Sequence, residues 1–138
     1  MKKGILALAG IAVLLAVPVA ASGDTAKVRG GDNFEIRFTL KSVNGEPTAL
    51  RRFRFSKLDA ACNGGATIIQ VRGKIRKIEV NNRNRFSETL RRSGRKVRVK
   101  GKVSGDLDTV RGTIRARGDF SDANQNCDSG IVRWKAGS

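Results

Sequence analysis

Apolar residues recur at every second position along most of this 138-residue chain, which is the period of a strand with one buried face. Residues 34–41 show the pattern clearly, because Phe, Ile, Phe and Leu alternate there with Glu, Arg, Thr and Lys. The turn-forming Asn44-Gly45 pair leads to a second predicted strand, which carries Phe53 and Phe55 inward and runs on to Cys62.

The next alternating segment changes phase part of the way along. Its inward positions are two residues apart up to Ile75 and then resume at Ile78. A one-residue slip turns the side chains of a strand to its other face. The pattern therefore predicts a bulge or a tight turn near Arg76-Lys77.

Two strongly alternating segments form the clearest predicted hairpin. Valine or glycine stands at every second position of residues 96–103, and apolar residues or glycines do so in residues 110–120. The turn between them covers residues 104–108. A short strand through residues 86–90 precedes this hairpin, and a last strand around Trp134 follows it.

The fold class follows from these strands. No segment keeps a 3.6-residue period, so little helix is expected after the N-terminal segment. About seven or eight short strands with regularly spaced turns predict an all-β fold, an antiparallel β-sandwich with a small β-barrel as the alternative.

The N-terminal residues 1–21 have the parts of a secretory signal peptide: Lys2 and Lys3, an apolar run, and small residues ending at Ala21. The alternative is an uncleaved membrane anchor, since the run approaches the roughly 20 residues that span a bilayer. Residues 22–31 are expected to form a flexible arm and residues 32–138 the β-sandwich domain. The protein is thus predicted to be secreted or extracytoplasmic, in the cell envelope, with no transmembrane span after signal cleavage.

Cys62 and Cys127 are the only cysteines, and an even count in an exported chain predicts a disulfide. On the chain-entropy model, closing a loop of this length stabilises the fold by roughly 4 kcal/mol. A catalytic or metal-binding thiol pair is the alternative, and it lacks both CxxC spacing and a His partner.

The chain has no His, which excludes Ser-His-Asp and Cys-His relays and any His-containing zinc site. Carboxylates remain for catalysis, for example Glu35 with Glu79 or Glu88. Each of these glutamates lies beside Arg on a polar face or in a loop. A carboxylate in such a position ordinarily pairs with a surface cation. We therefore expect a protein that is not an enzyme and has no cofactor.

Residues 122–128 carry side-chain oxygens at alternate positions, as calcium loops do. However, Cys127 stands where such a loop needs Gly, and Arg133 stands where it needs a bidentate Glu. An Asx-rich turn is the expected structure, with no metal bound.

Positive charge is the most distinctive property of the composition. Lys and Arg number 28 against 12 Asp and Glu, a formal charge of +16, and removal of Lys2 and Lys3 with the signal leaves 26 against 12, or +14. Periodicity puts much of this charge on outward strand faces. The candidate polyanion-binding residues are Arg52, Arg54, Arg72, Lys74, Lys96, Arg98, Lys100, Lys102, Arg111, Arg115, Arg117, Arg133 and Lys135.

If several of these strands share a sheet, their outer face forms a cationic plate that attracts polyanions. For an exported protein the expected partners are anionic envelope polymers or phospholipid head groups. The alternative is that Lys and Arg only keep the strand surfaces soluble and prevent edge pairing. Like charges opposite each other destabilise a sheet, which favours a counter-anion in use.

The aromatic residues limit the classes of ligand. Their positions share the inward phase of the aliphatic residues, which predicts a core role for Phe34, Phe38, Phe53, Phe55, Phe120 and Trp134. Stacking on bases or sugars needs exposed rings. We therefore do not expect sequence-specific nucleic-acid binding or a carbohydrate-binding module.

Several motifs resemble a pattern found in uncharacterised secreted proteins of actinobacteria. They are RRFRF leading to a Cys, FSxTL before the basic strand KVRVKGKVSG, TVRGTIRARG, and a closing C-x-SG-x-x-x-W-x-A segment at residues 127–136. The resemblance covers most of the mature chain. It implies an exported, disulfide-linked β-domain and no particular activity.

The sequence as a whole predicts an exported, non-catalytic β-domain that contacts anionic envelope polymers or membrane surfaces through its basic strand faces. One alternative is a protein-interaction domain that binds through loops, around residues 81–85 or 121–128. A carboxylate-based hydrolase is a further alternative. The oligomeric state is left open.

Overall fold

The computed structural model describes residues 24–31 and 33–137, and the predicted signal peptide, residues 1–21, lies outside them. Within the described residues the chain forms nine strands and a short 3-10 helix at Asn63–Gly65. The strands are β1 Asp24–Gly30, β2 Glu35–Val43, β3 Glu46–Cys62, β4 Thr67–Glu79, β5 Arg85–Arg92, β6 Arg95–Val103, β7 Thr109–Gly118, β8 Cys127–Asp128 and β9 Val132–Gly137.

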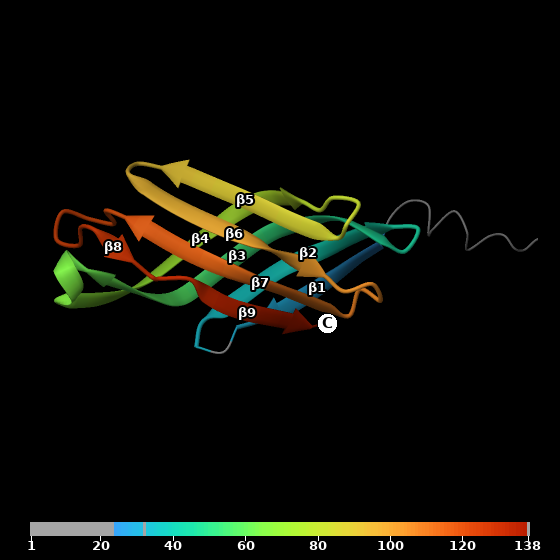
Figure 1. Ribbon diagram of the computed structural model, residues 1–138, viewed down its shortest axis with the longest axis horizontal. Helices are drawn as coiled ribbons and strands as arrows, with labels where there is room; N and C mark the ends of the chain where they lie inside the picture. Colours follow the sequence, from blue (N-terminus) through green and yellow to red (C-terminus); the bar gives the residue numbers. More distant parts are fainter. Residues whose placement is uncertain (1–23, 32, 138) are drawn as a thin grey trace, which may run out of the picture.

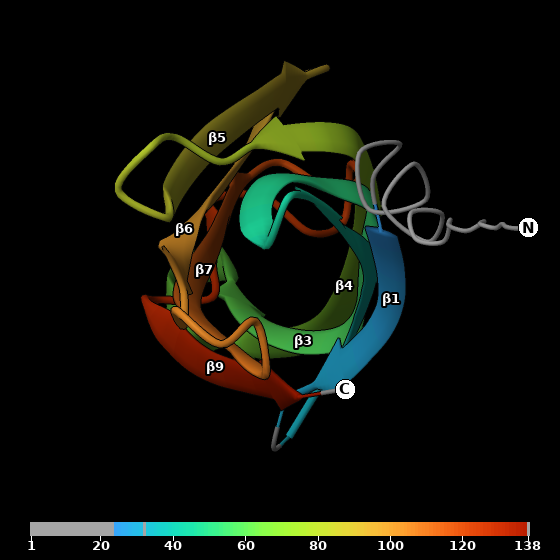
Figure 2. The ribbon, with the colours of Figure 1, turned by 90° about the vertical axis from the view of Figure 1, so that its right-hand side faces the viewer.

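The strands belong to one antiparallel sheet in the order β4-β3-β2-β1-β9-β7-β6-β5. The sheet curls like a half-barrel around a common core, as the view toward one end shows (Figure 2). The short β8 lies off this path and pairs with β3 and β7 at one end of the molecule (Figure 1). The predicted all-β antiparallel fold is confirmed, and the single curled sheet is closer to the small-barrel alternative than to two stacked layers.

Strand β1 joins the two arms of the sheet, β4-β3-β2 and β9-β7-β6-β5, along the main strand order. It lies between β2 and β9, pairing with β2 from Asp24 to Gly30 and with β9 at Arg29 and Gly30. Residues 22–31 were predicted to be a flexible arm, and this prediction is wrong for 24–30. The main chain of this segment pairs with β2 and β9. Backbone pairing of this kind cannot be recognised from the low hydrophobicity of the segment.

Strand β3 is bent by extra residues. Relative to β2 it carries one at Thr48 and one near Arg52, and relative to β4 it carries one near Lys57. Arg52 and Lys57 have φ angles of 54° and 60°, in the left-handed region. Bulges increase the local twist and bend of a strand, so this 17-residue strand follows the curve of the half-barrel.

The phase change predicted near Arg76-Lys77 is shared with β3. Strand β4 stays in register with β3 past the bulge at Arg52, with Leu50 opposite Ile78 and Phe53 opposite Ile75. The two strands therefore change phase together, β4 as predicted, and the ladder is interrupted between β2 and β3.

The core centres on four aromatic rings from four strands. The ring centroid of Trp134 in β9 lies 6.0 Å from Phe38 in β2, 5.8 Å from Phe53 in β3 and 6.2 Å from Phe86 in β5. All four side chains are buried. Aromatic pairs at this separation add to the free energy gained from burial, and here they tie the two arms of the sheet together.

Two glycines make room for these rings. Gly101 in β6 and Gly112 in β7 lie opposite each other in the register. A Cβ atom on Gly112 would be 2.7 Å from Cζ2 of Trp134, and one on Gly101 would be 2.7 Å from Cζ of Phe86. The rings therefore pack directly on the backbone of β6 and β7.

The disulfide between Cys62 and Cys127 is present. It joins the end of β3 to β8, which follows the loop after β7. Asn63 reinforces the link, because its Nδ2 donates a hydrogen bond to the carbonyl of Ala123 and its Oδ1 accepts one from the N–H of Gln125. Two segments far apart in the sequence are thus fixed at this end of the half-barrel.

The glycine contacts give a stability prediction. Gly112→Ala should lower the free energy of unfolding by about 1–3 kcal/mol, because the added methyl group overlaps Trp134 and the carbonyl of Lys100. Gly105→Ala is the matched control, since no atom lies within 4 Å of its added Cβ. Urea unfolding followed by Trp fluorescence measures both. Equal midpoints for the two variants would contradict the packing described.

Candidate functional site

The outer face of strands β5, β6, β7 and β9 carries a dense set of cations, which we call the cationic face. Inward positions of these strands are occupied by core residues such as Val99 and Ile114, and the alternate positions point outward. The cationic face consists of Arg85 and Arg91 from β5, Lys96, Arg98, Lys100 and Lys102 from β6, Arg111, Arg115 and Arg117 from β7, and Arg133 and Lys135 from β9.

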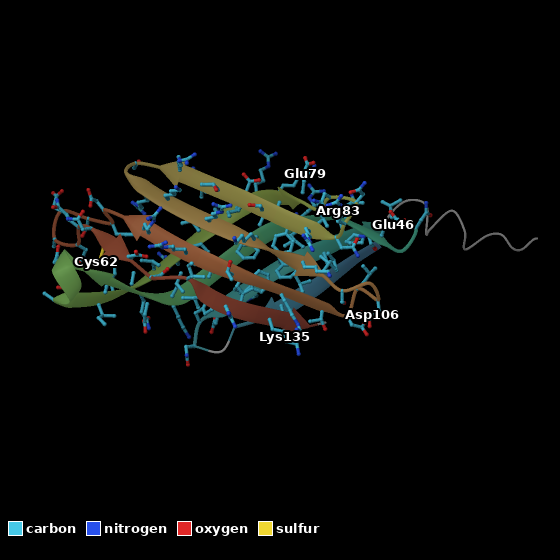
Figure 3. The ribbon with its side chains drawn as sticks, viewed as in Figure 1. Glu46, Cys62, Glu79, Arg83, Asp106 and Lys135 are labelled. Carbon is cyan, nitrogen blue, oxygen red and sulfur yellow. A yellow bond between two sulfur atoms is a disulfide. The ribbon has the colours of Figure 1, made fainter. Side chains whose placement is uncertain are left out.

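The strand register arranges these cations in rows across the sheet. One row runs over four strands as Arg85, Lys102, Arg111 and Lys135, each directly opposite the next. The side chain of Lys135 projects away from the sheet at the end of this row (Figure 3). Neighbouring strands lie about 4.8 Å apart, so the backbones that carry these like charges lie at about that spacing.

Other rows repeat the pattern. Lys96 in β6 lies opposite Arg91 on one side and Arg117 on the other. Arg98 lies opposite Arg115. Like charges directly opposite each other destabilise a sheet, so the cationic face carries repulsion that the core must offset.

Nine of the thirteen candidate residues named from the sequence belong to this face, namely Lys96, Arg98, Lys100, Lys102, Arg111, Arg115, Arg117, Arg133 and Lys135. Two members, Arg85 and Arg91, were missed. The strand through residues 86–90 was predicted, and its outward phase contains both arginines, so the signal was present in the alternation.

The other four candidates lie on the opposite arm of the sheet. Arg52 and Arg54 are exposed on β3, and Arg72 and Lys74 are exposed on β4. In the sheet, β2 and β1 separate this arm from β9. The structure therefore places the thirteen residues in two groups instead of one plate.

Few carboxylates compensate the cationic face. Among the described residues the ion pairs are Lys57 with Glu35, Lys77 with Glu79 and Arg115 with Asp128. Only the last involves this face: both Asp128 oxygens accept hydrogen bonds from Arg115, at 3.0 and 2.7 Å. Arg115 lowers the pKa of Asp128, and Asp128 raises the pKa of Arg115.

The pKa of Lys96 reflects the positive charges around it on the cationic face. Its pKa lies below the usual range because the positive charge of Arg91, followed by that of Arg117, disfavours the protonated amine. Partial burial and the charges of Arg98 and Arg115 act in the same direction. The electrostatic potential at Lys96 is thus positive.

Of the candidate catalytic carboxylates, Glu35 and Glu79 lie far apart. Glu35 accepts a hydrogen bond from Nζ of Lys57 at 3.1 Å, and Lys57 also lowers the pKa of Glu35. Glu79 lies across β3 from Lys41 in β2, because Ala49 of β3 is paired with both. Lys41 is six residues along β2 from Glu35. At the rise of a strand this is a separation of roughly 20 Å. Figure 3 shows Glu79 near Glu46 and Arg83, at the other end of the molecule from Cys62.

Glu88 lies on the inward phase of β5, two residues beyond the Val80–Phe86 bridge, whereas Glu79 is exposed on β4 just before Val80. In residues 24–31 and 33–137, no group of three or more Cys, Asp or Glu residues is placed to hold a metal ion.

The two loops proposed as alternative binding sites are held by their own polar groups. The Oδ1 atom of Asn81 accepts hydrogen bonds from the N–H groups of Arg83 and Arg85 at 2.9 and 3.0 Å. In the second loop, Asp119 accepts from the N–H of Asn126, and Asn124 Nδ2 donates to Ser121 Oγ. These side chains shape turns.

The aromatic side chains do not offer a stacking platform on the cationic face. Phe34, Phe38, Phe53, Phe55 and Trp134 are buried, as expected. Phe120 is half-buried, and the guanidinium carbon of Arg95 lies 5.2 Å from its ring centroid. The chemistry available on the cationic face is therefore charge attraction and hydrogen bonding by Arg and Lys.

The field at Lys96 can be measured. A ¹³C NMR titration of the Lys96 ε-carbon should give a pKa below the usual lysine value, and Arg117→Gln should raise it, because one of the opposing charges is removed. Glu46→Gln, at an exposed site outside the cationic face, serves as the control and should leave the Lys96 pKa in place. An ordinary lysine pKa in the unmodified chain would contradict the field described here.

Residues 24–31 and 33–137 contain no helix with the length and hydrophobicity that a bilayer span requires. Comparison with known proteins finds no matching family model, no matching curated protein and no matching solved structure.

Proposed function

We propose that this protein is an extracytoplasmic, non-catalytic binding domain that contacts anionic polymers of the cell envelope through the cationic face. The observation that supports this most is the row Arg85, Lys102, Arg111 and Lys135, which places like charges on four adjacent strands. Interspersed charges of both signs would keep the surface soluble without this repulsion. A polyanion would neutralise the row and relieve its repulsion.

The shape of the face favours a flexible polymer over a flat bilayer. The cationic face lies on the outside of the curled sheet, so it is convex (Figure 2). A planar membrane would touch a strip of such a surface, whereas a flexible chain of phosphate or carboxylate groups can follow the rows. Ile131, which is 68% exposed, is the large exposed apolar side chain beside Lys96 and Arg115. One isoleucine is a small apolar surface for insertion into lipid.

Attachment by charge has a defined salt dependence. Each cation that neutralises a phosphate releases counterions, so binding weakens steeply as salt increases. The affinity needs no specific sequence or sugar in the polymer, because the protein binds its repeated charges.

The test is retention of residues 22–138 on polyphosphate beads and on neutral beads over a salt series. The triple variant Lys102→Gln, Arg111→Gln, Lys135→Gln should elute at lower salt. The slope of log K against log salt should fall by about two to three, taking 0.7–0.9 for each phosphate that the variant no longer neutralises. The matched control, Arg51→Gln, Arg76→Gln, Arg83→Gln, removes the same charge from exposed sites elsewhere and should elute later than the triple variant.

Two results would overturn the proposal. One is equal elution of the two triple variants, which would make net charge the cause of binding in place of the cationic face. The other is binding to vesicles of anionic phospholipid without retention on polyphosphate, which would assign the face to membranes.

A further inference from the structure

A second cationic feature lies at the seam of the half-barrel, where the edge strands β4 and β5 face each other. An isolated bridge between Val80 and Phe86 joins the chain at one end of this seam. Farther along, residues of both strands line a groove of about 650 Å³. This volume is in the range of sites that bind small molecules.

Part of the groove is apolar. Phe55 from β3, Leu90 from β5, Val97 from β6 and Phe120 contribute hydrocarbon surface to it. Leu90 and Phe120 are half-buried and so remain accessible. Gly73 leaves space for the Phe55 ring, since a Cβ atom at residue 73 would lie 2.9 Å from Cε1 of that ring.

The rest of the lining is strongly basic. Arg37, Arg54, Arg72 and Lys74 contribute from β2, β3 and β4, and Arg92 and Arg95 contribute from β5 and β6. The acidic residue in the lining is Glu35, and its carboxylate is already hydrogen-bonded by Lys57 at 3.1 Å. The groove thus combines an excess of positive charge with a hydrocarbon surface.

We infer that this groove binds a single-chain anionic amphiphile, a molecule with a phosphate or carboxylate head and an unbranched apolar tail. The head group would be held by the arginines and Lys74, which donate charge-assisted hydrogen bonds to oxygen anions. The tail would cover Leu90, Phe120 and the edges of Phe55 and Val97. This site is separate from the cationic face, which lies on the outer side of β5, β6, β7 and β9.

Isothermal titration calorimetry with alkyl phosphates below their micelle concentrations tests the inference. Decyl phosphate should bind one-to-one and more tightly than octyl phosphate, by about threefold to fourfold for each added CH₂ that is buried, the ratio that corresponds to roughly 0.8 kcal/mol. Inorganic phosphate should bind far more weakly because it has no apolar tail, and neutral octyl glucoside because it has no anionic head. Comparing the affinity for decanoate with that for decyl phosphate shows whether the groove prefers a carboxylate or a phosphate head.

Variants locate the site. Leu90→Lys should weaken decyl phosphate binding at least tenfold by removing apolar surface, whereas Leu107→Lys, at a half-buried leucine outside the groove, should not. The double variant Arg72→Gln, Arg92→Gln should weaken binding and leave the core intact, because both side chains are exposed. The matched double variant Lys102→Gln, Arg111→Gln should keep decyl phosphate binding and elute from polyphosphate at lower salt. Near-ultraviolet circular dichroism of Trp134 confirms that each variant is folded.

The inference would be overturned by affinity that is independent of tail length, by equal binding of the neutral glucoside, or by unchanged binding in the Arg72→Gln, Arg92→Gln variant. None of these outcomes bears on retention by the cationic face, so the two sites fail or succeed independently.

Discussion

The packing of Trp134 between the two arms of the sheet is the interaction on which the structure depends. The ring reaches Phe38 and Phe53 on one arm and Phe86 on the other, and it rests on the backbone at Gly112. Such packing across an interior requires the sheet to curl. The glycines at 101 and 112 permit close approach, and the bulges in β3 supply the bend.

The curl also decides where the charge lies. Once the apolar phase of each strand faces the common interior, the alternate positions form a convex outer surface, and in β5, β6, β7 and β9 these positions are mostly Lys and Arg. The repulsion within rows such as Arg91, Lys96 and Arg117 opposes folding, and burial of the aromatic core offsets it. The incomplete closure of the same curl leaves the groove between β4 and β5, so both candidate sites follow from one architectural feature.

Much of this could be predicted from alternation alone. The inward phase of Phe34, Ile36 and Phe38 is confirmed, as are the hairpin between β6 and β7 and the disulfide. Alternation shows which face of a strand a residue occupies, but it does not show which distant strands are neighbours. It therefore could not predict that β1 joins the two arms, or that Arg52 and Lys135 lie in separate groups. The row from Arg85 to Lys135 depends on the register of three strand pairs, and the groove depends on how far the sheet closes; both are properties of the folded chain.

We infer that a bound polyanion relieves the repulsion within the cationic rows and so stabilises the folded chain. The most direct measurement is the urea midpoint of residues 22–138 as inorganic polyphosphate is added at constant ionic strength. We predict a rise that continues with the logarithm of the polyphosphate concentration and reaches about 2.7 kcal/mol in unfolding free energy at 100 times the dissociation constant, with little effect from the same amount of monophosphate. A midpoint that does not change with polyphosphate, or that rises equally with monophosphate, would contradict the claim.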